Sequence, residues 1–221
     1  MRSREDILQK KWQRLLQHRR FFHLIPFIDF VLVSGSMALG TAREESDFDV
    51  IVGARTGRIF TVRFFCVVVF ELAGVRRARA DHRGNVKDKV CFNHFVAPGG
   101  YVLASPRNEY SEVMYRNLVP LYGDKQKISK FVKANVWVRR SRKVDYARHL
   151  IGRLNLVSRV LMIALGGRAG DAIERTLKRY QIHRIAKYKR RLGDSLHIIC
   201  TDDVIQFHPM HKHISTGSVS D

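Results

Sequence analysis

Two aspartates one residue apart carry the clearest chemical signal in this chain. Asp47 and Asp49 open an apolar run that continues through Val52. Side chains at positions i and i+2 of a strand point to the same face, so a strand here predicts two neighbouring carboxylates. Two such charges repel each other, and a hard divalent cation removes the conflict. Mg²⁺ typically takes one or two carboxylates together with substrate phosphates.

A glycine–serine pair stands a short distance before these aspartates. Gly35 and Ser36 follow residues 30–33, an apolar β-branched run that predicts a buried strand. Residues 37–39 suit a short helical turn, which Gly40 would end. The free N–H groups at a helix start attract phosphate, and glycine lets a triphosphate approach the backbone. A phosphate cradle beside a carboxylate pair suits phosphoryl or nucleotidyl transfer.

The combination resembles the signature of the DNA polymerase beta-like nucleotidyltransferase superfamily, and most closely its small stand-alone domain proteins. The resemblance rests on Gly35-Ser36 and on Ser46-Asp47-Phe48-Asp49 between two apolar runs, and it covers roughly residues 25–100. It implies that Asp47 and Asp49 hold Mg²⁺ or Mn²⁺ and that Gly35 and Ser36 hold the triphosphate of an NTP. An ordinary buried hairpin with an acidic turn is the alternative, but it leaves the carboxylate pair unexplained.

The chain departs from the family pattern in one respect. Family members usually carry a third carboxylate on a later strand, whereas the next strand-like run, residues 89–96, contains no acidic residue. Asn93 and His94 stand where that acid is expected, and Asp88 precedes the run. His94 would offer a base with a near-neutral pKa. Both residues would otherwise be polar side chains at the edge of a cleft.

Two arginines flank the signature. Arg43 and Arg63 are candidates to neutralise the triphosphate charge. Arg63 is the stronger candidate, because a single arginine in an otherwise apolar helix needs a partner or a cleft. A structural salt bridge explains Arg63 equally well.

The periodicity of the chain predicts an α/β (α+β) fold with a small mixed sheet flanked by helices. An amphipathic helix is expected over residues 4–20, and a buried helix over residues 58–75. The sequence Pro98-Gly99-Gly100 is the clearest boundary, so we expect a nucleotidyltransferase-like domain over residues 1–100. A basic helical domain over residues 101–214 would follow, with a flexible tail at 215–221. Its expected helices span residues 109–118, 128–138, 144–165 and 170–191.

The composition is strongly basic. A net charge of +20 and a pI near 10.5 imply a polyanionic partner or substrate. Residues 139–191 hold 16 Lys and Arg against three acidic residues, with tyrosines among them. Basic helices with interleaved aromatic residues can follow a phosphate backbone, so RNA or another polyanion is the expected partner. A solvated helix face that aids solubility is the alternative.

The cysteines and the apolar stretches indicate the cellular compartment that we expect for the protein. Cys66, Cys91 and Cys200 are widely spaced, which fits reduced thiols of a cytoplasmic protein better than a disulfide framework. The N-terminal sequence lacks the apolar core of a signal peptide, and the most apolar stretch, residues 64–70, is too short to span a bilayer. His208, His211 and His213 could bind a metal, although no Cys, Asp or Glu stands near them to complete a site.

The sequence therefore favours transfer of a nucleoside monophosphate from an NTP to an acceptor hydroxyl, with release of pyrophosphate. The acceptor and the oligomeric state are not specified. A catalytically degenerate member that binds nucleic acid or a partner through its basic helices is the competing interpretation, supported by the missing acid. A peripheral membrane protein that uses the 58–75 helix is a third.

Overall fold

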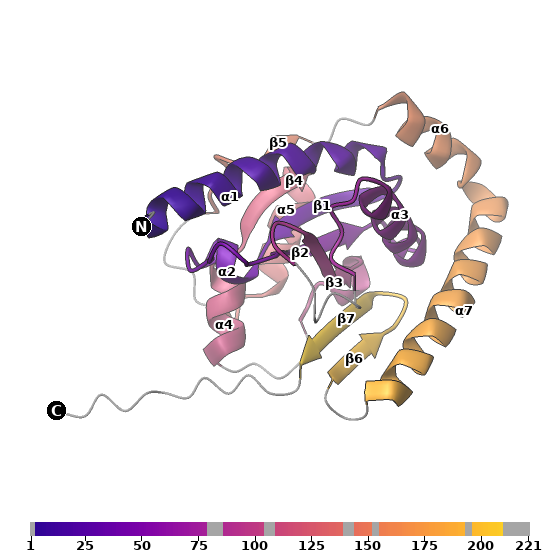
Figure 1. Ribbon diagram of the computed structural model, residues 1–221. Helices are drawn as coiled ribbons and strands as arrows, with labels where there is room; N and C mark the ends of the chain where they lie inside the picture. The colour runs from indigo at the N-terminus through magenta and orange to yellow at the C-terminus, as the bar shows by residue number, and fades with distance from the viewer. Residues whose placement is uncertain are drawn as a thin grey trace.

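The strands of the protein form one mixed sheet with helices on both faces. The computed structural model describes residues 3–78, 86–103, 109–138, 144–151, 155–192 and 196–209. Within those ranges the strand order is β5-β4-β1-β2-β3-β7-β6 (Figure 1). The expected mixed α/β class is therefore confirmed.

Both parallel and antiparallel pairs occur in the sheet. β2 pairs in parallel with β3, and β4 pairs in parallel with β5, while the other neighbours are antiparallel. The strand bounds are β1 Ile28–Val33, β2 Phe48–Ala54, β3 Val90–Val96, β4 Val119–Gly123, β5 Leu150–Ile151, β6 Leu196–Cys200 and β7 Val204–Pro209.

The helices match several of the expected segments. A capping box between Ser3 and Asp6 starts the first helix, which ends before the 3₁₀ turn that leads to Pro26. The bounds are α1 Arg4–His18, η1 Arg19–Leu24, α2 Gly35–Ala38, α3 Ile59–Leu72, η3 Pro98–Gly100, α4 Glu109–Arg116, α5 Lys125–Ala134, α6 Leu156–Ala164 and α7 Gly167–Leu192.

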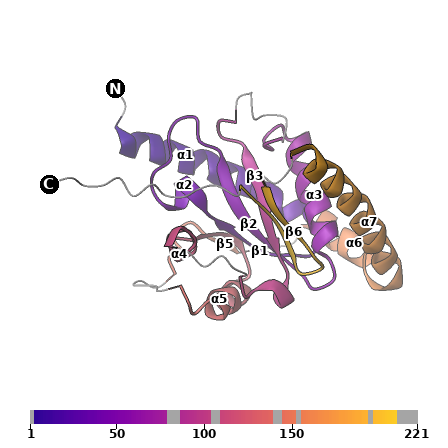
Figure 2. The same ribbon diagram turned by 90° about the horizontal axis from the view of Figure 1, so that it is seen from below.

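Alternation along the central strands divides the core into two clusters. Val50 and Val52 of β2 face a cluster that includes buried side chains of α1, η1 and α3. Ile51 faces the opposite cluster, to which α5 contributes Ile128 and Phe131. Figure 2 shows the sheet between these two layers, with α4 and α5 on one side and α3 and α7 on the other.

Polar side chains attach α7 to the start of α3. The buried Glu174 carboxylate accepts hydrogen bonds from the backbone N–H groups of Phe60 (2.9 Å) and Thr61 (2.8 Å). Gln181 donates to the carbonyl of Phe60 at 2.8 Å. Glu174 thus satisfies N–H groups that a helix start leaves without an intrahelical partner, and its negative charge suits that end of the helix dipole.

Two sequence expectations about the second half of the chain are wrong. Residues 144–165 do not form one helix, because β5 pairs with β4 and α6 begins only at Leu156. The Asn155 side chain accepts a hydrogen bond from the Ser158 N–H and starts α6 there. The region after residue 100 is also not purely helical. It supplies β4 and β7, which pair with β1 and β3 of the first half.

Candidate metal and nucleotide site

Asp47 and Asp49 lie together at the start of β2. Both side chains are partly buried, and they precede Ile51 on the same face of the strand. The N–H of Ser34 donates to the carbonyl of Asp49 at 2.9 Å, which joins the end of β1 to this part of β2. The expected side-by-side arrangement of the two carboxylates is therefore present.

Gly35 lies directly against the Asp49 carboxylate. Its φ of +65° is in the left-handed region, and a Cβ atom built there would stand 2.5 Å from Asp49 Oδ2. A side chain at position 35 would therefore be strained and would also displace the carboxylate. Gly35 begins the one-turn helix α2, in which Ser36 is half-buried and Met37 enters the core.

Each carboxylate accepts a hydrogen bond from a side chain. Arg77 donates to Asp47 Oδ2 at 2.5 Å, and Asn93 donates to Asp49 Oδ1 at 3.0 Å. Burial alone would lower the pKa of Arg77, but Asp47 and other nearby negative groups prevail and raise it. Sequence reasoning missed Arg77, which stands among many basic residues that nothing local distinguishes.

Cys91 completes a group of three potential metal ligands. It stands opposite Asp49 in the β2–β3 register. The ligand atoms of Asp47, Asp49 and Cys91 all lie within 4.8 Å of one another. Burial, followed by the charges of Asp49 and Asp47, raises the pKa of the Cys91 thiol. The sequence offered one signal, since Cys91 is two residues before Asn93 on a strand.

Asn93, rather than His94, reaches the carboxylates. The β2–β3 register shifts between the Phe92 and His94 pairs, which leaves Asn93 as an additional residue on β3. His94 pairs with Ile51, is only 2% exposed, and places its ring 6.4 Å from that of Tyr115 in α4. His94 therefore lies deeper in the second core cluster.

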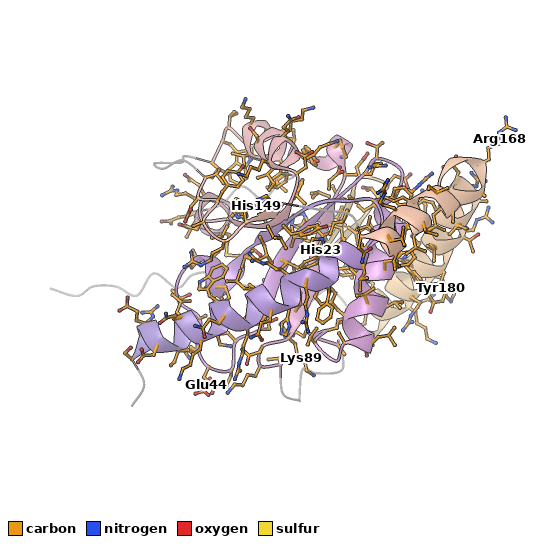
Figure 3. The ribbon with its side chains drawn as sticks, turned by 90° about the horizontal axis from the view of Figure 1, so that it is seen from above. His23, Glu44, Lys89, His149, Arg168 and Tyr180 are labelled. Carbon is orange, nitrogen blue, oxygen red and sulfur yellow. The ribbon has the colours of Figure 1, made fainter. Side chains whose placement is uncertain are left out.

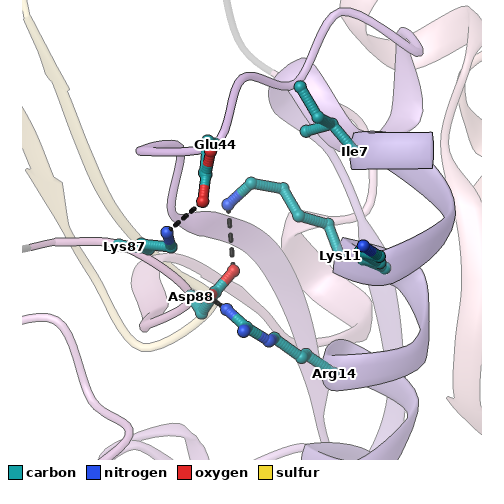
Figure 4. Close-up of a pocket in the computed structure, with 7 residues that line it drawn as sticks. Ile7, Lys11, Arg14, Glu44, Lys87 and Asp88 are labelled. Carbon is teal, nitrogen blue, oxygen red and sulfur yellow. Dashed lines mark hydrogen bonds and ion pairs between the residues drawn. The ribbon is translucent and has the colours of Figure 1, made fainter. Parts of the chain in front are cut away.

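Asp88 is bound to α1. Its carboxylate forms ion pairs with Lys11 (2.9 Å) and Arg14 (Figure 4). Lys11 also donates to the carbonyl of Ser46. Lys11 is 3% exposed, and burial followed by the charges of Lys87 and Arg14 lowers its pKa. The adjoining pocket holds about 30 Å³, which is room for water but not for a nucleotide.

The two flanking arginines have different surroundings. Arg43 is exposed, and its N–H donates to the Ser46 hydroxyl within the turn that leads to Asp47. Arg63 lies on α3, against the other face of the sheet. Its guanidinium donates to Gln181 at 2.7 Å and lies 5.5 Å from the ring of Phe207. Arg63 therefore extends from α3 towards α7 and β7, where Gln181 is its structural partner.

The basic residues of α7 point mostly outward. Gly170, Glu174, Gln181 and Ile185 form its buried face. Tyr180 is 52% exposed, and it and Arg168 are seen on the outer side of the helix in Figure 3. Lys178 forms an ion pair with Asp202 at 2.7 Å. The other exposed basic residues of α7 are Arg175, Arg179, Arg184, Lys187, Lys189 and Arg190.

Some predicted features lie outside the described residues. They include positions 139–143 and 152–154 of the basic segment, His211, His213 and the tail at 215–221. In the described ranges, every helix is either too short or too polar to cross a bilayer.

Comparisons with known proteins provide no relative for this chain. No protein-family model, curated protein or solved structure matches it.

Proposed function

We propose that the protein is a metal-dependent nucleotidyltransferase that moves a nucleoside monophosphate from an NTP to an acceptor hydroxyl. The observation that carries this proposal is the contact between Gly35, at the start of α2, and the Asp49 carboxylate beside Asp47. A glycine turn that offers N–H groups, next to two carboxylates, places phosphate and cation binding side by side. The nucleotidyltransferase-like fold belongs to the same proposal.

The two carboxylates fit a divalent cation. Asp47 and Asp49 would hold a divalent cation, which the family resemblance suggests is Mg²⁺ or Mn²⁺, and the cation would neutralise charge on the transferred phosphoryl group. Asn93 fixes the orientation of Asp49, and Arg77 fixes that of Asp47. These bonds leave further lone pairs on each carboxylate, because an ionised carboxylate offers about four.

Groups at the surface of the site would bind the triphosphate. The Gly35 and Ser36 amides would bind the triphosphate, with the Ser36 hydroxyl as an additional donor. Arg43, which is exposed on the adjoining turn, would neutralise part of the triphosphate charge. Arg77, which lies at the carboxylates, would take the charge-neutralising role that the sequence suggested for Arg63.

A screen of labelled NTPs with Mg²⁺, Mn²⁺, Co²⁺ or Zn²⁺ tests the proposal. Asp47→Asn or Asp49→Asn should abolish turnover, with a loss of roughly a thousandfold or about 4 kcal/mol of transition-state stabilisation. Unfolding measurements on both variants provide the control for stability. Equal turnover by the wild type and both variants would show that these carboxylates do not hold the catalytic metal.

A second candidate is a degenerate nucleotidyltransferase-fold protein that binds RNA or another polyanion. Two observations favour it. β3 carries Cys91 and Asn93 beside Asp49 and contains no acid. The exposed face of α7 carries basic side chains that do not attach it to α3.

Salt dependence separates this candidate from the first. Lys178 is already paired, so the reversal variant is better built as Glu at Arg175, Arg179, Lys187 and Lys189. The logarithm of wild-type RNA affinity should fall with the logarithm of salt by about 0.7 per neutralised phosphate, and the variant should lose this binding. Metal–NTP binding should survive, because exposed charges more than about 10 Å apart are screened at 0.1 M salt. Absence of wild-type affinity at low salt would leave α7 as a solubility face.

A further inference from the structure

The third potential metal ligand beside Asp47 and Asp49 is a sulfur atom. Cys91 stands opposite Asp49 on the neighbouring parallel strand, and its Sγ lies within 4.8 Å of ligand oxygens of both Asp47 and Asp49. Asp49 and Cys91 are paired residues of two central strands, and Asp47 immediately precedes β2. The β2–β3 ladder therefore fixes the backbone positions of Asp49 and Cys91, and rotation of side chains is enough to change the separations of the ligand atoms.

The separations suit a tetrahedral metal site. Metal–oxygen bonds of about 2.1 Å and metal–sulfur bonds of about 2.3 Å place tetrahedral ligands roughly 3.5 Å apart. Ligand atoms within 4.8 Å of one another therefore need to move by only about an ångström. Three protein ligands would leave the fourth position open for a substrate oxygen, as in catalytic zinc sites.

The donor set matches Mg²⁺ poorly. Mg²⁺ prefers oxygen ligands in octahedral geometry, whereas sulfur favours softer cations. Zn²⁺ and Co²⁺ accept carboxylate and thiolate together. A β3 strand with a cysteine and no acidic residue therefore favours a softer cation than Mg²⁺ at this position.

We propose that Cys91 is the third ligand of the metal held by Asp47 and Asp49, and that the site selects a thiophilic cation of the Zn²⁺ class over Mg²⁺. The inference rests on the proposed function in that the same two carboxylates bind the metal. Binding converts the Cys91 thiol to a thiolate, and the proton passes to solvent. The bond formed is metal–sulfur, and no oxidation or reduction is involved.

Cobalt provides a direct probe, because a cobalt–thiolate bond gives a charge-transfer absorption that carboxylate and imidazole ligands do not. The full-length protein, stripped with a chelator, should acquire this band on titration with Co²⁺. Cys91→Ser should abolish the band and weaken the carboxylate-dependent binding by at least about tenfold, the lower end of what changes around a metal site cost. Asp49→Asn should also lose the band. Cys200→Ser is the matched control, because Cys200 is another free, partly buried thiol, and it should retain the band.

A second variant keeps the proposal testable even if Cys91→Ser does not fold. Cys91→Asp restores three carboxylates and should shift the preference from Co²⁺ towards Mg²⁺ in competition titrations. If Co²⁺ binding depends on Asp49 but gives no thiolate band, the role of Cys91 is wrong and the carboxylate site stands. If none of Co²⁺, Mn²⁺ and Mg²⁺ binds in a manner that depends on Asp47 and Asp49, the proposed function fails as well.

Discussion

Replacing Asn93 with aspartate places a third carboxylate against Asp49. In the wild type, Asn93 Nδ2 donates to Asp49 Oδ1 at 3.0 Å. The variant loses this hydrogen bond to a charged group, which contributes about 1.5–3 kcal/mol. It also brings two negative charges about 3 Å apart, a repulsion of about 5 kcal/mol at an effective dielectric constant of 20. Because such a pair takes up a proton instead of bearing the full repulsion, we expect a net loss of about 3 kcal/mol at pH 8.

The loss should depend on pH and on metal. The added carboxyl has a pKa near 3.9 in the unfolded chain and a raised pKa when folded, so the folded state binds more protons between these values. Stability of Asn93→Asp relative to wild type should therefore fall as pH rises from about 4 through the folded pKa. A divalent cation removes the repulsion, and at 100 times its Kd it should restore about 2.7 kcal/mol.

Urea unfolding at pH 5 and pH 8, without metal and with either Mg²⁺ or Co²⁺, measures these effects. Asn117→Asp is the matched control, because Asn117 is exposed at the end of α4, and it should respond to neither pH nor metal in this way. Equal destabilisation of Asn93→Asp at both pH values, with no recovery in Mg²⁺ or in Co²⁺, would refute the placement of position 93 beside a metal-binding carboxylate.

Three further predictions concern stability, each measured by urea unfolding. Gly35→Ala should cost at least about 1 kcal/mol more than Gly40→Ala, because both glycines have positive φ but only the Cβ added at position 35 meets a carboxylate. Equal costs would show that position 35 does not lie against the Asp49 carboxylate. Glu174→Ala should cost about 3 kcal/mol, because it leaves buried donors of α3 unpaired. Asp171→Ala, which removes a half-exposed carboxylate paired with Arg58, should cost less than Glu174→Ala, at about 1 kcal/mol; a larger loss for Asp171→Ala than for Glu174→Ala would contradict the docking of α7 through Glu174. The wild type should become more stable as pH rises from the lowered pKa of Lys11 towards about 10.4, and Lys11→Met should lack this rise. Parallel stability–pH profiles of the wild type and the variant would contradict the burial of the Lys11 ammonium group.

The sequence predicts the core of the site because its determinants are local. The strand periodicity around Asp47 and Asp49 and the glycine at position 35 depend only on neighbouring residues. The partners of the carboxylates depend on chain segments that meet only in the fold. Arg77 reaches Asp47 because residues 75–77 run beside the start of β3, and the parallel β2–β3 pair is separated in sequence by α3.

The second half of the chain was less predictable for a different reason. β5 has two residues, which is too short to give a strand periodicity. Glu174 and Gln181 stand among many basic residues in the sequence of α7, and their partners are backbone groups of α3, which no sequence pattern identifies. The charge composition therefore indicated the exposed basic face of α7 but not the face that packs against α3.

The position of β3 in the sheet affects the order in which the protein is assembled during synthesis. One edge of β3 pairs with β2, whereas residues 94–96 on its other edge pair with β7, which begins at Val204. A nascent chain that ends before β7 therefore leaves backbone donors and acceptors of β3 without their native strand, a surface on which other chains can pair. The strand that carries Cys91 and Asn93 therefore gains its second neighbouring strand only after the residues of β7 have left the ribosome.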